Sequence, residues 1–194
     1  MLAKVSSSAI FGLTFHHVDV EVDIASGLPL FTIVGLPDSA VKESKERVRA
    51  ALKNSGYNVP IKRVTINLAP ADLKKEGSAY DLPMAIGILA AEGLVPRDAL
   101  DRFMIMGELS LDGRIKGIRG ALPMAVGARS ERVESLIVPT ENAAEAAVVD
   151  GLNVYGASNL PQVVEFLRGE RPLPVERVDV SGLFRNLALL TATK

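Results

Sequence analysis

Polar and apolar residues alternate strictly over residues 17–24, which places three valines and an isoleucine on one side of the chain. A period of two is typical of a half-buried strand, so the segment is predicted to be a strand with its apolar side in the core. A turn-forming sequence, SGLP at 26–29, separates it from a second β-rich run at 31–34. Two such runs joined by a short loop predict a β-hairpin.

Helical spacing of apolar residues begins after Asp38, a residue type whose side chain accepts hydrogen bonds from the free N–H groups at a helix start. The pattern predicts a helix over 39–55, ended by Gly56. A second helix is predicted over 82–92, with Asp81 as its cap and a proline in its first turn. Its residues are apolar on almost every side, so we expect it to be the central buried helix.

The rest of the chain alternates between strand and helix patterns, which indicates an α+β fold with a mixed sheet covered by helices. Ser158 is the predicted cap of the last helix in this series, and the stretch from 169 to 175, with two prolines, is typical of a linker. The predicted strands are 61–68, 103–109, 114–118, 135–138 and 153–155, and the predicted helices are 120–129, 141–149 and 159–168.

Composition narrows the class of protein. The chain has 194 residues, of which 48% are apolar and 23% charged, as in an ordinary globular domain. Its longest apolar run is far shorter than the roughly 18 residues of a membrane span, and its start lacks a secretory signal pattern, so we predict a cytoplasmic protein without a transmembrane helix. There is no cysteine, and 22 basic residues against 23 acidic ones leave a net charge of −1. Contact with a nucleic acid would therefore have to come from a local basic patch.

Common catalytic and cofactor motifs are missing from the sequence. It contains neither a G-x-x-x-x-G-K-[ST] phosphate loop nor a G-x-G-x-x-G turn, so this chain alone is not expected to hydrolyse ATP or to bind a dinucleotide. Its two histidines, His16 and His17, are adjacent on a predicted strand and face opposite ways, which is unsuitable geometry for a metal ion. No cofactor and no metal are predicted for this chain.

Three segments carry a specific resemblance to a known family. They read FTIVGLPDSAVKES at 31–44, NLAPADLKKEGSAYDLP at 67–83 and MGEL at 106–109. Over residues 1–169 the chain resembles the N-terminal region of the ComM/YifB family, the magnesium-chelatase-like AAA+ ATPases linked to competence and DNA branch migration. The resemblance implies a domain over 1–169 with the fold of the Lon proteolytic domain, the ribosomal protein S5 domain 2-like fold. It also implies that 170–194 form a linker or stub toward a separate AAA+ module, which would hold the ATP and Mg²⁺ of the family.

Similarity to Lon proteases makes a sharp prediction about catalysis. Lon-type enzymes use a serine nucleophile in a G-P-S-A-G loop and a lysine general base in a later G-G-L-K turn. Aligned on these motifs, the chain carries Ala79 at the serine position and Leu122 at the lysine position. Neither hydrocarbon side chain can attack a carbonyl group or accept a proton, so the domain is expected to be non-catalytic. Ser78, one residue away, leaves open the alternative of a residual serine hydrolase, although no lysine stands near position 122 to serve as its base.

A cluster of basic residues is the remaining functional feature. Residues 38–63 contain seven basic and three acidic side chains. Helical spacing places four of the basic residues on one face, and two lysines from the next loop extend the patch: Lys42, Lys45, Arg49 and Lys53, with Lys74 and Lys75. Such a patch is a candidate contact for DNA phosphates. The alternative is a solvated helix face partly neutralised by Glu43 and Glu46.

These features lead to one principal prediction and two alternatives. The principal prediction, carried by the family resemblance, is a non-enzymatic Lon-like domain that assembles with, positions or regulates an AAA+ motor acting on DNA in natural transformation. The resemblance implies two kinds of partner: an AAA+ module, in cis or in neighbouring subunits of a hexamer, and DNA. The alternatives are the Ser78 hydrolase and a free-standing interaction module with no motor in the same chain.

Overall fold

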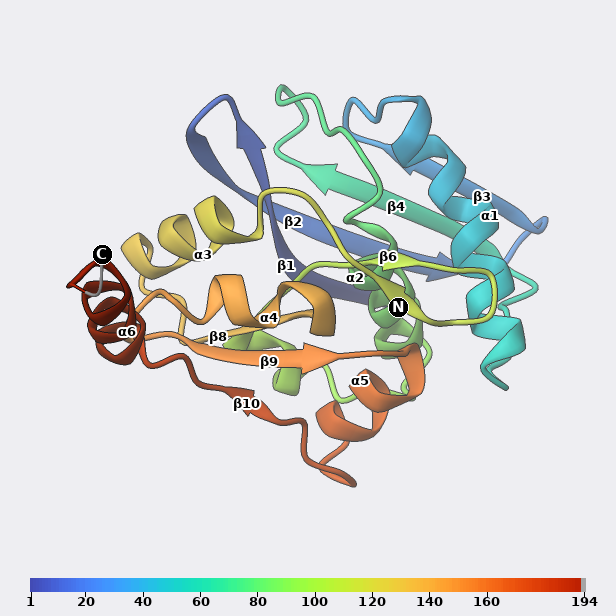
Figure 1. Cartoon of the computed structure of the whole chain (residues 1–194). Helices are drawn as coiled ribbons and strands as arrows, with labels where there is room; N and C mark the ends of the chain where they lie inside the picture. Colours follow the sequence, from blue (N-terminus) through green and yellow to red (C-terminus); the bar gives the residue numbers. More distant parts are fainter. Residues whose placement is uncertain (193–194) are drawn as a thin grey trace.

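The computed structural model describes residues 1–192, with side chains for all of these but 183 and 184. The strands are β1 (Leu2–Phe11), β2 (Thr14–Ala25), β3 (Leu30–Val34), β4 (Arg63–Ala69), β5 (Phe103–Ile105), β6 (Glu108–Leu109), β7 (Ile115–Lys116), β8 (Ser135–Pro139), β9 (Asn153–Ala157) and β10 (Val175–Glu176). Eight of them form one mixed sheet in the order β10-β9-β8-β5-β1-β2-β4-β3, while β6 and β7 pair separately (Figure 1). The predicted α+β class with a mixed sheet is thus confirmed.

Helices cover both faces of this sheet. They are α1 (Ser39–Asn54), α2 (Asp81–Ala91), α3 (Ala121–Ser130), α4 (Thr140–Ala146), α5 (Leu160–Leu167) and α6 (Val180–Ala192), with a short 3₁₀ helix at Asp98–Arg102. Neighbouring residues of β5 point to opposite faces: Ile105 belongs to the core that contains α1, α2 and α5, whereas Met104 belongs to the core that contains α3 and α4. In the view of Figure 1, α3 and α4 lie on the near side of the sheet and α2 lies on its far side.

The strand predicted over 17–24 is confirmed as part of β2, but the hairpin predicted for it is wrong. Its three valines and its isoleucine are buried, as the alternation requires. β2 forms its hairpin with β1, whereas β3 pairs in parallel with β4. The physical reason is that β4 occupies the second edge of β2 over seven residue pairs, which leaves β3 to add on the far side of β4. A parallel pair needs a crossover connection, and α1 provides it.

The central helix is α2, as predicted, because all eleven of its residues are buried. It lies against β1 and β2. The approach is so close that a Cβ atom on Gly87 would be 2.6 Å from Val22 Cγ2. A residue without a side chain is therefore required at this point of the helix.

Of the three predicted helix caps, only Asp38 is confirmed, since its Oδ1 accepts a hydrogen bond from the N–H of Val41 at 2.8 Å. Asp81 is wrong as a cap: it lies in the first turn of α2, after Tyr80, and its carboxylate binds an arginine of α1 instead. Ser158 is also wrong, because the cap of α5 is the next residue, Asn159, which accepts from the N–H of Gln162 at 3.0 Å.

Regular secondary structure continues beyond Gly169. β10 pairs with β9 at the edge of the sheet, through Val175↔Tyr155 and Glu176↔Val154, and α6 follows it. Figure 1 shows β10 running from the α5 side of the molecule toward α6. The stretch predicted as a linker or stub therefore contains a strand and a helix. No helix among residues 1–192 combines the length and the apolar character that crossing a membrane requires.

Candidate functional site

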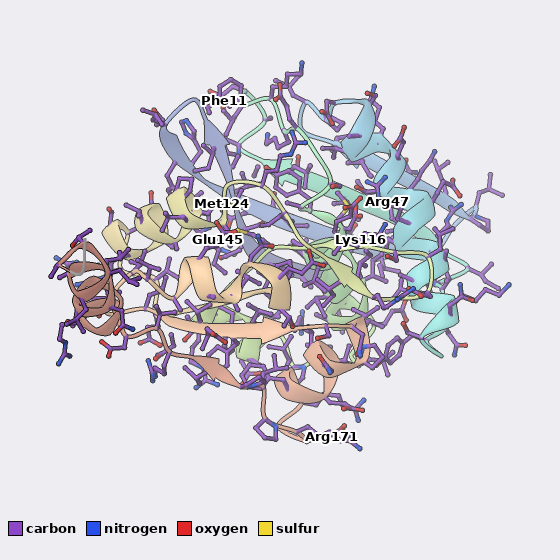
Figure 2. The ribbon with its side chains drawn as sticks, viewed as in Figure 1. Phe11, Arg47, Lys116, Met124, Glu145 and Arg171 are labelled. Carbon is purple, nitrogen blue, oxygen red and sulfur yellow. The ribbon has the colours of Figure 1, made fainter. Side chains whose placement is uncertain are left out.

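The serine-loop segment and the lysine-turn segment of the Lon resemblance face one cavity. The cavity has a volume of about 680 Å³ and lies between the end of β1, the loop 77–80 and the segment 117–120. Phe11 and Met124, both labelled in Figure 2, are on two of its walls. We call this space the β1 cavity.

Ala79 lines the β1 cavity and Leu122 does not. Ala79 is fixed by its backbone, since its C=O accepts a hydrogen bond from the N–H of Gly107 at 2.9 Å. Leu122 lies in the first turn of α3 with 40% of its surface exposed and is not among the residues that line the cavity. The structure therefore brings only one of the two aligned positions to the cavity, and there the side chain is a methyl group, which is no nucleophile.

Three hydroxyl-bearing residues, Ser8, Ser78 and Tyr80, and the amine of Lys74 also line the β1 cavity. Ser8 Oγ donates to Met106 Sδ at 3.1 Å, and Lys74 Nζ lies 3.7 Å from Glu76 Oε1. Among residues 1–192 no hydrogen bond joins the Ser78 hydroxyl to Lys74 or to any other amine. A serine and its base must lie within hydrogen-bond reach, and this arrangement does not meet that requirement.

The strongest polar feature beside the cavity is a buried ion pair that the sequence analysis missed. Asp81, two residues after Ala79, is fully buried and accepts two hydrogen bonds from Arg47 of α1, at 2.6 and 3.1 Å. A third comes from the N–H of Leu109 at 3.1 Å. The pair thus ties α1, α2 and β6 together next to the loop that carries Ala79. Figure 2 labels Arg47 among the side chains of α1.

Burial decides the electrostatics of this pair. It raises the pKa of Asp81, and the hydrogen bonds from Arg47 oppose that rise. The pKa of Arg47 is itself raised, chiefly by its hydrogen bond to Asp81, so the arginine stays charged. The sequence held a signal for the pair: a lone carboxylate at the start of an apolar, buried helix requires a partner.

The predicted basic patch is only partly present on the surface. Lys42, Lys45, Arg49 and Lys53 are exposed on α1, and Lys74 is exposed on the loop after β4. The guanidinium of Arg49 also lies 5.3 Å from the ring centre of Phe31. The patch on α1 is thus available to a ligand, and Lys74 lines the β1 cavity.

Lys75 was wrongly included in this patch. It is fully buried, and its Nζ donates to the backbone carbonyl oxygens of Gly35 and Pro70. Its backbone pairs with the same loop, because its N–H donates to Leu36 and its C=O accepts from Asp38. Burial lowers the pKa of Lys75. The side chain joins two loops and cannot reach a phosphate in solution.

Metal ligands do not gather in the part of the chain that the structure describes. No three His, Cys, Asp or Glu residues among 1–192 form a group that could hold a metal ion.

Comparison with known proteins assigns the family. Residues 20–142 match the family described as subunit ChlI of Mg-chelatase. The chain is 45% identical over 174 residues to the competence protein ComM of Haemophilus influenzae, covering 90% of this chain and 34% of that protein. It is 44% identical over 182 residues to YifB of Escherichia coli, covering 91% and 36%. The chain therefore belongs to the magnesium-chelatase ChlI-like family that includes ComM and YifB.

A more distant similarity agrees with the fold. The chain is 28% identical over 128 residues to Lon protease 2 of Bacillus subtilis, which covers 66% of this chain and 23% of the protease. This similarity fits a Lon-like domain. The chain spans about a third of the length of the ComM and YifB relatives, at 34% and 36%.

Proposed function

We propose that this chain is a non-catalytic Lon-like domain of a ComM-type AAA+ protein, and that it assembles with, positions or regulates a motor that acts on DNA. The observation that carries the proposal is Ala79 on the wall of the β1 cavity, where the Lon resemblance requires a nucleophile. The name of the Haemophilus influenzae relative, a competence protein, supports a role in natural transformation. A cytoplasmic location, a hexamer, and ATP with Mg²⁺ in a separate AAA+ module are parts of the same proposal.

A serine-directed probe tests the non-catalytic part. The purified chain is treated with a fluorescent fluorophosphonate, with Ser78→Ala and an active serine peptidase as controls. We expect the chain and Ser78→Ala to give the same background labelling, because the Ser78 hydroxyl makes no hydrogen bond to a base among residues 1–192. Labelling of the chain that Ser78→Ala abolishes would instead favour the residual hydrolase.

The exposed basic face of α1 is the proposed DNA contact. If Lys42, Lys45, Arg49 and Lys53 each neutralise one phosphate, log K falls with log[salt] with a slope of about −3.6, or roughly a hundredfold between 50 and 200 mM salt. Fluorescence anisotropy of a labelled DNA fragment measures this slope. We expect the double variant Lys45→Glu/Arg49→Glu to lose most of the binding.

A matched charge control separates the patch from the overall charge. Lys4→Glu/Lys116→Glu changes the net charge by the same amount at exposed positions of β1 and β7. If both double variants weaken binding equally, the patch on α1 is not the contact. Binding that responds neither to salt nor to either variant would contradict DNA contact by this domain.

A free-standing interaction module is the second candidate function. The gene sequence beyond Lys194 distinguishes it from the principal proposal. A phosphate-loop motif within the following segment is expected for a domain of an AAA+ protein. A stop codon directly after Lys194 would favour the free-standing module.

A further inference from the structure

The edge of β1 is open where it borders the β1 cavity. The β1–β2 hairpin is closed by the pair Phe11↔Thr14 around a two-residue turn, so these two residues exchange both of their backbone hydrogen bonds. Strict alternation along the strand then directs the N–H and C=O of Ile10 away from β2. On that other side β1 meets β5 at a single position, Ser6↔Met104.

β5 ends at Ile105, well before the level of Ile10. The chain then turns away, because the N–H of Met106 donates to Ile137 and that of Gly107 to Ala79. Within residues 1–192 no strand pairs with β1 at Ile10 on this side. Ile10 is half-buried and lines the β1 cavity.

The opposite wall of the cavity is a stretch of backbone held in place by a side chain. Asn142 of α4 accepts from the N–H of Ile118 at 2.8 Å and donates to its C=O at 2.9 Å. The amide thus engages Ile118 as a neighbouring strand would. Gly117 and Arg119, on either side of Ile118, line the cavity, and so does Gly120. A Cβ atom on Gly120 would lie 3.9 Å from Ile10 Cγ1, so the two walls approach each other at this end.

We propose that the β1 cavity binds an extended peptide that adds as a strand to the open edge of β1. Main-chain hydrogen bonds to an exposed edge give affinity in this binding mode, and pockets for alternate side chains give selectivity. The volume of about 680 Å³ is in the range of ligand-binding pockets. Because Ala79 replaces a nucleophile, the peptide is held without being cleaved. Peptide binding does not depend on DNA contact, and only the absence of cleavage rests on the proposed function.

The side chains that line the β1 cavity, and their charges, indicate the chemistry of the peptide. Aliphatic and small side chains suit the walls, which include Ile10, Ala79 and Met124. Arg119 is exposed at the rim and makes no ion pair with any residue of 1–192, whereas Lys74 is already paired with Glu76. The carboxylates of Asp38, Glu76 and Glu108 also line the cavity, so an acidic group of the peptide is complementary where it meets the unpaired arginine. The partner is therefore an extended, aliphatic polypeptide segment with an adjoining carboxylate.

The test uses the chain as it exists and a defined probe. The probe is a fluorescein-labelled hexapeptide of alternating valine and alanine that ends in aspartate, and binding is measured by fluorescence anisotropy. Two control peptides carry N-methyl groups on one or the other alternate set of amides, which blocks pairing along one edge of the peptide. We expect saturable binding of the probe and at least about tenfold weaker binding of one of the two methylated peptides, because pairing with the edge of β1 needs one alternate set of peptide N–H groups.

Variants locate the site. Ala79→Phe fills the cavity and is expected to weaken binding at least about tenfold, whereas Leu122→Phe, outside the cavity, leaves it unchanged. Arg119→Glu is expected to reverse the preference between the aspartate peptide and a peptide ending in lysine. Backbone amide NMR shifts on adding the probe provide a test in the unmodified chain, and they should be largest at residues 8–11 and 117–120.

Clear outcomes would overturn the inference. No saturable binding up to about 1 mM probe, binding of both methylated peptides as tight as that of the probe, or shifts confined to the sheet edges β3 and β10 would each refute it. Cleavage of the probe, detected by mass spectrometry with shifts still at 8–11, would support strand addition and contradict the non-catalytic function. The two proposals therefore fail in distinguishable ways.

Discussion

Removing Arg47 from its pair with Asp81 is expected to destabilise the fold strongly at neutral pH. Arg47→Met retains a long unbranched side chain but loses two hydrogen bonds to the carboxylate, at 2.6 and 3.1 Å. Hydrogen bonds to charged groups contribute about 1.5–3 kcal/mol each. Breaking a buried ion pair by removing one partner costs about 3–5 kcal/mol. We expect Arg47→Met to lower the free energy of unfolding by about 3–5 kcal/mol, because Asp81 is fully buried and the Arg47 side chain is only 19% exposed.

The same variant should show a characteristic pH dependence. Burial raises the pKa of Asp81 above its ordinary 3.8, and the Arg47 hydrogen bond is the largest of the effects that lower it. Without Arg47 the pKa rises further, so the folded variant takes up a proton at higher pH than the wild type. A group whose pKa is raised by folding adds stability below its unfolded pKa and loses that contribution as pH rises. The stability difference between variant and wild type should therefore shrink as pH falls from about 7 toward about 4.

Urea unfolding followed by circular dichroism at several pH values measures both effects. Glu43→Gln is the control, because Glu43 contacts the same arginine at 3.4 Å but is 70% exposed. This change should alter the free energy of unfolding by less than about 0.5 kcal/mol. A loss below about 1 kcal/mol for Arg47→Met, or a loss independent of pH, would refute the reasoning. It would mean that the hydrogen bonds from the Leu109 N–H and the Ser44 hydroxyl are sufficient for the Asp81 carboxylate.

Three further changes test other polar and close contacts. Lys75→Met leaves the carbonyl groups of Gly35 and Pro70 without their donor and should lower the free energy of unfolding by about 1–3 kcal/mol for each unsatisfied group, measured by thermal unfolding. Lys74→Met, at the exposed neighbouring residue, should have little effect. Gly127→Ala places a Cβ atom against the ring of Phe15 and should lower the free energy of unfolding by at least about 1–3 kcal/mol. Adding Phe15→Leu to the same chain should recover part of this loss. An unchanged free energy of unfolding for Gly127→Ala would contradict this packing. Asp38→Ala removes the cap of α1 and should lower the free energy of unfolding in urea by about 1 kcal/mol, whereas Asp38→Ser should retain most of it. Equal stability of the wild type and these two variants would rule out the cap.

Local patterns in the sequence predict the individual strands and helices of this fold better than they predict which strands pair with each other. The alternation over 17–24 identified β2, and the continuous apolar character of α2 identified the buried helix. β1 was not predicted, because three serines at 6–8 interrupt its apolar alternation. The hairpin was assigned wrongly because periodicity describes one strand at a time, whereas the place of β4 between β2 and β3 depends on pairing between distant segments.

At the candidate site, too, the sequence indicates single segments but not the contacts between distant ones. The Lon resemblance indicated which two segments to compare, and the structure places both at the β1 cavity. Charged residues were harder to interpret, because Lys74 and Lys75 are identical in type and adjacent, yet one is exposed and the other is fully buried. The difference arises from the carbonyl groups of Gly35, 40 residues away in the sequence, and of Pro70, which both accept hydrogen bonds from the Lys75 ammonium group. Only tertiary structure brings those acceptors to the ammonium group.

Two polar anchors hold the loop 77–80, which lines the β1 cavity. Asp81 fixes one end of the 77–80 loop through Arg47, and Asp38 reaches the other end, since its Oδ2 accepts from the N–H of Gly77 at 3.3 Å. Lys75 holds the loop that carries Asp38. None of these contacts involves the side chain of Ala79, so the side chain at that position can change without loosening the loop. Selection on stability alone would therefore preserve the shape of the cavity whichever side chain stands at position 79.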